Sequence, residues 1–182
     1  MSRGERTAAP AAASAAAAAA AFRWLAFGDL SALDLHRILR ARVDVFVVEQ
    51  ACPYPEVDGL DPACLHVVGE GGGGDLLAYA RVLPPGLKYP EAALGRVLTS
   101  LAVRGTGVGR ALLAEALAGM DRRWPGVPVR IGAQSHLERF YGEFGFRTVS
   151  APYEEDGIEH VEMLRAPADG ASLPGANATP TA

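Results

Sequence analysis

The sequence is short of cysteine, of long apolar runs and of excess positive charge, and each shortage excludes a class of protein. Two cysteines among 182 residues are too few for a disulfide framework and indicate a reducing compartment, so we expect a cytoplasmic protein. No run of about 18 or more strongly apolar residues occurs, so the sequence predicts no membrane span. A formal net charge of −4 without a basic cluster argues against nucleic acid as the main partner.

The length and composition of the sequence indicate one globular domain. The length is that of about one domain, and a hydrophobic content of 49% is ample for a core. The alanine-rich residues 1–21 and the residues 167–182, rich in Ala, Pro, Gly, Ser and Thr, predict disordered extensions. Arg3 and Arg6 precede the alanine run, but a signal peptide is the weaker alternative because the run has no leucine or isoleucine core. The folded domain is expected over residues 22–166.

A glycine-rich segment joins a predicted strand to a predicted helix. Residues 94–99 have the strand pattern, and residues 104–110 read Arg-Gly-Thr-Gly-Val-Gly-Arg. The helix pattern that follows puts one apolar face at Leu112, Leu113, Ala116, Leu117 and Met120. The first N–H groups of a helix lack partners in the chain, and the helix dipole adds about half a positive charge there. Because Gly107 and Gly109 carry no side chain that would keep a phosphate away, we expect this loop to bind a pyrophosphate.

Three known glycine motifs could account for the sequence of this loop, and a glycine-rich turn without a ligand is a further alternative. A Walker A loop ends in Gly-Lys-Ser/Thr, whereas Arg110-Ala111 follows here. A dinucleotide fingerprint needs an acidic residue about 20 positions on, but Asp121 comes 12 positions after Gly109 and inside the helix pattern. The remaining pattern, Arg-x-x-Gly-x-Gly, resembles the coenzyme A pyrophosphate loop of the GNAT acyltransferase superfamily.

Further stretches strengthen this resemblance. Phe140-Tyr141-x-x-x-Gly145-Phe146 is similar to the GNAT signature after the fifth strand, and Gln134 stands where many members carry asparagine. Residues 46–61 resemble the region after the first helix in ElaA-like GNAT proteins. The same family is similar at residues 95–97, 132–137 and 153–160. The resemblance spans roughly residues 22–165, and Leu101, where many GNAT proteins have proline, is one departure.

The resemblance and the order of the patterns predict an α/β (α+β) GNAT fold. This fold has a mixed, mostly antiparallel sheet of six to seven strands, flanked by helices on both faces. The expected strands are residues 22–27, 65–68, 76–83, 94–99, 129–134, 146–150 and 159–164. The expected helices run from a Ser31-x-x-Asp34 capping box through Phe46, from Gly109 onward, and over residues 137–144.

The resemblance also implies an activity and a set of site residues. It implies an N-acetyltransferase that moves the acetyl group of acetyl-CoA, bound as a co-substrate, to a primary amine by direct attack. Tyr141 would be the general acid, and simple core packing is its alternative role. The residues that the resemblance assigns to acetyl-CoA are Val97, Leu98, Thr99, Arg104, Gly105, Thr106, Gly107, Val108, Gly109, Arg110 and Gln134.

The general base is less clear. The candidates are Glu49, Asp58, Asp61, His66 and His160, and Glu49 and Asp58 rank first because they lie in the ElaA-like stretch. The acidic stretches 56–61 and 154–156 would attract a cationic amine or would simply be solvated. Cys64-x-His66 resembles the start of a metal site, but the sequence offers no second paired cluster, so no metal is predicted.

Two other functions stay open at this level. One is an acyltransferase like the acyl-homoserine lactone synthases, and the other is a non-catalytic coenzyme A-binding regulatory domain. The expected partner of the leading interpretation is a small-molecule or peptide amine, with no nucleic acid and no membrane. The sequence does not fix the oligomeric state and leaves a homodimer open.

Overall fold

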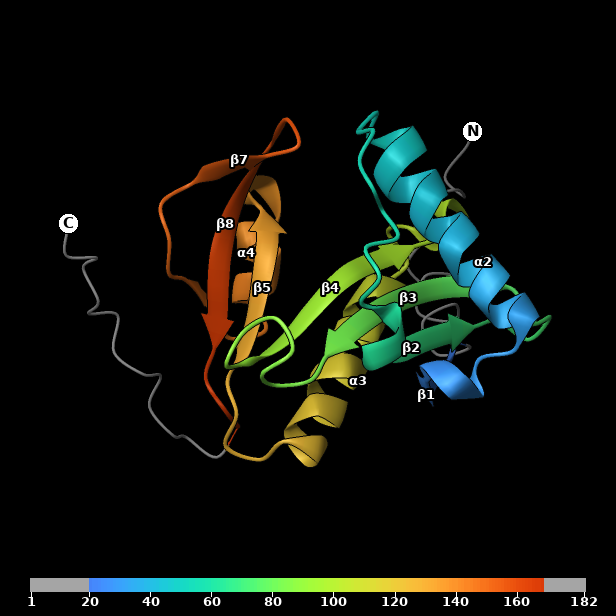
Figure 1. Ribbon diagram of the computed structural model, residues 1–182, viewed down its shortest axis with the longest axis horizontal. Helices are drawn as coiled ribbons and strands as arrows, with labels where there is room; N and C mark the ends of the chain where they lie inside the picture. Colours follow the sequence, from blue (N-terminus) through green and yellow to red (C-terminus); the bar gives the residue numbers. More distant parts are fainter. Residues whose placement is uncertain (1–19, 169–182) are drawn as a thin grey trace, which may run out of the picture.

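The computed structural model describes residues 20–168, through which one mixed sheet of eight strands runs (Figure 1). The strand order is β1-β2-β3-β4-β5-β8-β6, with β7 paired to β8, and only the β4–β5 pair is parallel. The strands are β1 Ala21–Ala26, β2 Leu65–Glu70, β3 Leu76–Leu83, β4 Ala92–Thr99, β5 Val129–Gln134, β6 Phe146–Thr148, β7 Tyr153–Glu155 and β8 Ile158–Arg165. The predicted extensions at residues 1–21 and 167–182 lie outside the described residues, except for two residues at each boundary.

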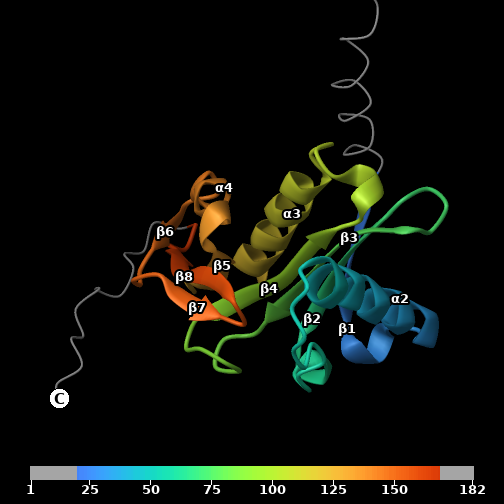
Figure 2. The same cartoon turned by 90° about the horizontal axis from the view of Figure 1, so that it is seen from above.

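Helices cover both faces of the sheet, which confirms the predicted fold class (Figure 2). α2 (Ala32–Arg42) lies on one face, and α3 (Val108–Arg123) and α4 (Glu138–Gly142) lie on the other. Leu112 of α3 belongs to the larger core cluster between α3 and the sheet. Ile38 of α2 belongs to a smaller cluster on the opposite face. Each helix therefore buries one apolar stripe, as amphipathic helices on a sheet do.

The first helix begins as the sequence predicts but ends differently. Ser31 Oγ accepts a hydrogen bond from the Asp34 N–H at 3.0 Å, and the Ser31 N–H donates to Asp34 Oδ2 at 3.1 Å, which completes the capping box. The chain is helical through Phe46 as predicted, but its last part, Val43–Glu49, is a π-helix that follows α2. Its wider turns change which side chains share a face. A pattern of period 3.6 cannot reveal such a segment.

The strand β7 is one more than the six or seven predicted. It has three residues and pairs with β8, with Tyr153 opposite His160. Asp156 and Gly157 connect the two strands, and both have positive φ, at 52° and 81°. This backbone is what the tightest hairpin turns require. The Asp-Gly dipeptide was the available signal, but three residues are too short to show alternation.

β4 and β5 lie side by side only at their beginnings. Ala92 pairs with Val129 and Ala93 pairs with Arg130, and these are the pairs between the two strands within residues 20–168. The rest of β4, up to Thr99, therefore has an edge that β5 does not cover. Backbone N–H and C=O groups on such an edge are free to bind a ligand.

A bulge in β4 accompanies this divergence. Tyr79 of β3 is opposite Leu98, but Arg81 is opposite Gly95, so β4 has one extra residue in this interval. Arg96 lies there with φ of 53°, a left-handed conformation that costs a non-glycine residue roughly 1–2 kcal/mol. Bulges bend a strand and redirect its side chains. The bulge thus helps to turn β4 away from β5.

Gly119 lies in α3 where Trp24 of β1 crosses the helix. The indole Nε1 donates to Glu115 Oε1 at 3.0 Å, and the Arg123 guanidinium lies 4.0 Å from the indole centroid. A Cβ atom added at Gly119 would lie 2.0 Å from Trp24 Cζ2, inside any real contact distance. Close packing therefore explains the glycine.

Gly119→Ala is expected to lower the free energy of unfolding by about 1–3 kcal/mol, because the indole must move. The expected loss of stability is the opposite of the usual effect, since alanine usually stabilises a helix interior relative to glycine. Gly142→Ala is the matched control, because an added Cβ at this helical glycine meets nothing within 4 Å. Urea denaturation of both variants measures the difference, and a gain in stability for both would contradict the packing.

Candidate active site

The divergence of β4 and β5 opens a cavity of about 1000 Å³, called here the main cavity. Strands β4, β5 and β8, the π-helix and α4 all contribute to its wall, through residues that include Leu98, Ala133, His160, Phe46 and Tyr141. A second cavity of about 560 Å³, called here the loop cavity, is lined by residues between Val103 and Arg110 together with Phe140. The two cavities share Thr99 and Arg104, so they adjoin.

The structure brings most of the predicted acetyl-CoA residues to these two cavities. Val97, Leu98, Thr99 and Gln134 line the main cavity. The residues that line the loop cavity include Arg104, Gly105, Thr106, Gly107, Gly109 and Arg110. Val108 is the exception, because its side chain is fully buried in the larger core cluster. Only its backbone can face a ligand.

The beginning of α3 has free hydrogen-bond donors. Gly107 is the N-cap residue with φ of 89°, and no side chain caps this end of the helix. Thr106 directs its hydroxyl elsewhere, to the Val103 carbonyl oxygen at 2.6 Å. The uncapped N–H groups and the helix dipole together favour an anion. A pyrophosphate fits this end of the loop cavity on charge and on space.

Arg104 connects the glycine loop to the π-helix. Its guanidinium donates to both carboxylate oxygens of Glu49, at 2.6 and 2.9 Å. The hydrogen bond from Arg104 holds the pKa of the Glu49 carboxyl below its ordinary value. The Glu49 carboxylate is therefore ionised and already paired with an arginine in this structure. This pairing makes Glu49 a poorer candidate for the general base.

Tyr141 lies on the wall of the main cavity and also belongs to the core. Its ring packs edge-on against Phe140 and Phe146, with centroid distances of 5.2 and 5.9 Å. The residue is 7% exposed, and burial raises the pKa of its phenol to about 12. The phenol therefore keeps its proton at neutral pH while facing the cavity. Core packing and a chemical role are compatible here.

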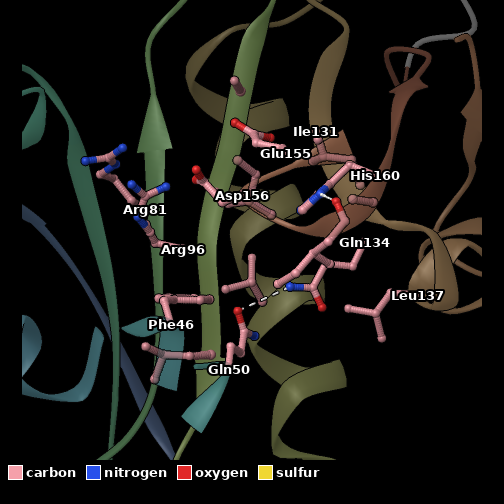
Figure 3. Close-up of a pocket in the computed structure, with 18 of the residues that line it drawn as sticks. Phe46, Gln50, Arg81, Arg96, Ile131, Gln134, Leu137, Glu155, Asp156 and His160 are labelled. Carbon is pink, nitrogen blue, oxygen red and sulfur yellow. Dashed lines mark hydrogen bonds between the residues drawn. The ribbon is translucent and has the colours of Figure 1, made fainter. Parts of the chain in front are cut away.

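Two contacts join the segment after the π-helix to the wall of the main cavity formed by β5 and the β7–β8 turn. Gln134 Nε2 donates to Gln50 Oε1 at 3.3 Å (Figure 3). Cys52 Sγ donates to the Asp156 carbonyl oxygen at 3.3 Å. Gln50 and Cys52 follow the π-helix, whereas their partners belong to β5 and the β7–β8 turn. The segment after the π-helix thus bridges both walls of the cavity.

A buried ion network closes one side of the main cavity. Arg42 is fully buried, and its guanidinium donates to Glu56 Oε1 at 2.8 Å and to Asp61 Oδ1 at 2.7 Å. Arg81 donates to Asp58 at 2.6 and 2.8 Å and to Asp61 at 2.9 Å. Arg42, Arg81, Glu56 and Asp61 have little access to water, so these charges depend on their partners, whereas Asp58 is partly exposed.

Arg96 is the third arginine of this network. Its Nε donates to Glu56 Oε1 at 2.6 Å, its Nη2 lies 3.6 Å from Asp58 Oδ2, and its guanidinium lies 5.6 Å from the Tyr54 ring centroid. The prediction for the acidic stretch 56–61 therefore needs correction. Glu56 and Asp61 are buried and Asp58 is partly exposed at the cavity wall, and all three carboxylates are paired with arginines. No pattern in the sequence indicates the roles of Arg42 and Arg81.

The network also makes several of the predicted bases less able to accept a proton. Burial alone would raise the pKa of the Asp58 carboxyl, but the Arg81 guanidinium outweighs it and holds that pKa well below its ordinary value. Asp61 is 4% exposed and bonded to two arginines. His66 is fully buried, with Nδ1 2.8 Å from the Tyr79 hydroxyl and Nε2 3.2 Å from the Asp61 carbonyl oxygen. Among the five candidates, only the half-buried His160 has neither an arginine partner nor both ring nitrogens hydrogen-bonded within residues 20–168.

The Cys64-x-His66 pair does not form a metal site. Both ring nitrogens of His66 already have partners, and burial raises the pKa of the Cys64 thiol to about 11. Within residues 20–168, no group of three His, Cys, Asp or Glu side chains is placed to hold a metal ion. Both cysteines are free thiols. Among the described helices, none is long and apolar enough to cross a membrane.

This geometry defines a class of protein. A sheet that diverges beside a bulged fourth strand, next to a glycine-rich helix start, is the architecture of a GNAT acetyltransferase. Residues 86–166 match the family model of the acetyltransferase (GNAT) domain. Members of this fold typically use an acyl-CoA.

The comparisons with individual proteins narrow the class. Protein ElaA of Escherichia coli (strain K12) is 43% identical over 143 residues, which cover 78% of this chain and 93% of ElaA. A UPF0039 protein of Synechocystis sp. is 45% identical over 148 residues, 81% of this chain and 96% of that protein. The chain therefore belongs to the ElaA-like family of the GNAT superfamily.

Solved structures agree with this assignment. An acyl-CoA N-acyltransferase from Pseudomonas aeruginosa is 41% identical with a TM-score of 0.76, over 80% of this chain and 99% of that one. The crystal structure of Escherichia coli ElaA is 40% identical by this comparison, with the same TM-score and the same coverage. The eight-stranded fold described above is thus that of known GNAT proteins.

The buried network predicts a loss of stability in acid. Arg42 and Arg81 outweigh burial and lower the pKa of the Asp61 carboxyl, so the ionised form stabilises the folded state. That contribution is present above the pKa of an unfolded aspartate, about 3.9, and is lost as the pH falls toward the folded value. Asp61→Asn is expected to cost about 3–5 kcal/mol at pH 7, because it removes the negative charge that Arg42 and Arg81 share and leaves the buried network with one positive charge uncompensated.

Urea denaturation at several pH values tests this expectation. The wild type should lose stability below about pH 4, and Asp61→Asn should lose less over the same interval. Asp29→Asn is the control, since Asp29 is exposed and substitutions at such positions stay within about 0.5 kcal/mol. Equal stability of Asp61→Asn and the wild type at pH 7 would show that the network is energetically neutral.

Proposed function

We propose that the protein is an N-acetyltransferase that transfers the acetyl group of acetyl-CoA to a primary amine by direct attack. The observation that carries this proposal is a continuous path. The uncovered edge of β4 runs from the glycine-rich start of α3, where a pyrophosphate fits, to the cavity wall that holds Tyr141. The acceptor is a small-molecule or peptide amine that enters the main cavity.

Each part of this path has a task in acetyl transfer. The N–H groups at the start of α3 would hold the pyrophosphate, and the free edge of β4 at Val97, Leu98 and Thr99 would hold the pantetheine arm. Fixing both fixes the thioester, which makes the attack effectively unimolecular. A backbone N–H of the same edge would face the thioester oxygen, where negative charge develops.

Tyr141 is the proposed general acid. As the C–S bond breaks, the departing thiolate takes the phenol proton. The buried phenol, whose pKa is raised to about 12, is fully protonated at neutral pH and thus ready to donate. No other group is needed on that side of the thioester.

Glycine at the start of α3 offers a test of donor binding. Gly107 has positive φ, so any side chain there strains the backbone as well as filling the cavity. Gly109 is the better choice, because it lies inside α3 and an added Cβ would be 3.4 Å from Thr99 Cγ2. Gly109→Val should abolish most coenzyme A affinity in titration calorimetry, since the branched side chain fills the anion site. Unchanged affinity in a protein with a normal thermal melt would contradict the assignment of the loop.

The role of Tyr141 is tested by removing one oxygen atom. Tyr141→Phe should keep the affinity for acetyl-CoA and lower kcat by about 10²–10⁴, the usual contribution of a general acid. The phenyl ring keeps the packing against Phe140 and Phe146, so stability serves as the internal control. Equal rates would mean that Tyr141 only fills the core.

A screen for thiol release from acetyl-CoA decides among the remaining alternatives. Release with small amines or lysine peptides supports the transferase. Coenzyme A binding without release under any condition supports a regulatory domain. Release from an acyl carrier protein thioester alone supports a relative of the acyl-homoserine lactone synthases, which usually lack an Arg-x-x-Gly-x-Gly loop.

A further inference from the structure

His160 is a titratable group in the main cavity that the buried network does not engage. It lies on β8, directly opposite Gln134 of β5, and the side chain is half-buried. Figure 3 shows the imidazole beside Gln134, on the wall that faces Arg81 and Arg96 across the cavity. The ring stacks on Tyr153 of β7, with a centroid distance of 6.0 Å and an angle of 28°. One face of the imidazole therefore lies toward Tyr153.

One hydrogen bond determines where the proton of the neutral imidazole lies. His160 Nδ1 is 2.8 Å from the Ile158 carbonyl oxygen. A carbonyl oxygen only accepts, so Nδ1 must carry the hydrogen and donate it. Nε2 then holds the lone pair. Nε2 forms no hydrogen bond to any residue between positions 20 and 168, whereas both nitrogens of His66 are engaged.

The charges around His160 are mostly balanced. Glu162, two residues along β8, accepts from the Tyr153 hydroxyl at 3.0 Å and lies 3.4 Å from Arg130. Glu155 and Asp156, at the β7–β8 turn, are exposed and line the same cavity.

On the opposite wall, Arg81 and Arg96 are paired with carboxylates of the buried network. His136 follows β5 and is exposed at the cavity rim. Among the charged residues that line this cavity within positions 20–168, Glu155, Asp156 and Lys88 take part in no ion pair, so two negative charges stand against one positive charge and favour a cationic acceptor.

We propose that His160 is the general base that removes the proton from the ammonium group of the acceptor. His160 has this role only if the protein acetylates amines as described above, so the assignment rests on the proposed function. Imidazole suits the task because the lone pair of an unprotonated ring nitrogen can accept a proton from an ammonium group. The competing carboxylates Glu49 and Asp58 are both bonded to arginines.

The proton balance of the reaction closes with these groups. Nε2 of His160 takes one proton from R–NH₃⁺ and later releases it to solvent. The amine lone pair then forms the C–N bond to the thioester carbon, and the C–S bond breaks as the tetrahedral intermediate collapses. Tyr141 protonates the thiolate, and the second proton lost by the nitrogen restores the phenol. The products are the N-acetyl amine, coenzyme A and one proton.

His160→Gln tests the proposal through its dependence on pH. The probes are 2-phenylethylamine, spermidine and a lysine peptide, each with acetyl-CoA. At neutral pH, kcat/KM should fall by about 10²–10⁴. The defect should shrink as the pH approaches about 10.4, where such amines lose their proton to solvent and need no base. His36→Gln is the matched control, since His36 is exposed on α2 and outside both cavities.

The outcomes separate the two proposals. A wild type that releases no thiol with any probe contradicts the proposed function itself. A working wild type with an equally active His160→Gln variant, or with a defect of the same size at every pH, contradicts only the role of His160. Nitrogen-15 NMR of histidine-labelled wild type gives a test that needs no variant. Nδ1–H with an unprotonated Nε2 is expected, and the opposite tautomer would overturn the proposal.

Discussion

Arg42 is the last residue of α2 and is fully buried, so carboxylates must neutralise it inside the protein. Glu56 and Asp61 do so, and they also bind the other two arginines of the network, Arg96 and Arg81. Buried pairs of this kind add little net stability, but an incomplete one is costly. Six charges on four segments must therefore reach their places together. The end of α2, the segment 56–61, β3 and the bulge of β4 are fixed by this requirement.

The bulge of β4 connects the buried ion network to the main cavity. Arg96 is held in a left-handed conformation that costs free energy, and its guanidinium is bonded to Glu56 at 2.6 Å. Strain of this kind persists only where the surroundings determine it. The bend at Arg96 accompanies the loss of pairing between β4 and β5 after Ala93. The charge network at one wall of the main cavity thus supports the opening between β4 and β5 that the proposed chemistry needs.

Local patterns in the sequence predicted the features that depend on local physics. The capping box at Ser31, the glycine loop before α3 and the strand-and-helix order follow from spacing alone, and each is found. The network was missed because its pairs join positions 14 to 40 residues apart, and an arginine at the end of a helix usually indicates an exposed charge. The π-helix and β7 were missed because neither leaves a regular period. The fold could therefore be predicted from the sequence, whereas the ion pairs of the site became visible only in the three-dimensional structure.

The choice among candidate general bases also could not be made from sequence patterns. Glu49 and Asp58 ranked first by position, and the structure places both at the main cavity, yet each is bonded to an arginine that lowers its pKa. A carboxylate stabilised in this way has little tendency to take a proton. The proposed acid and base instead differ by environment. Tyr141 of α4 packs against apolar rings, which keep its proton in place, whereas one ring nitrogen of His160 on β8 is fixed by a backbone carbonyl oxygen. Separation of this kind allows a single cavity to donate a proton at the thiol and accept one at the amine.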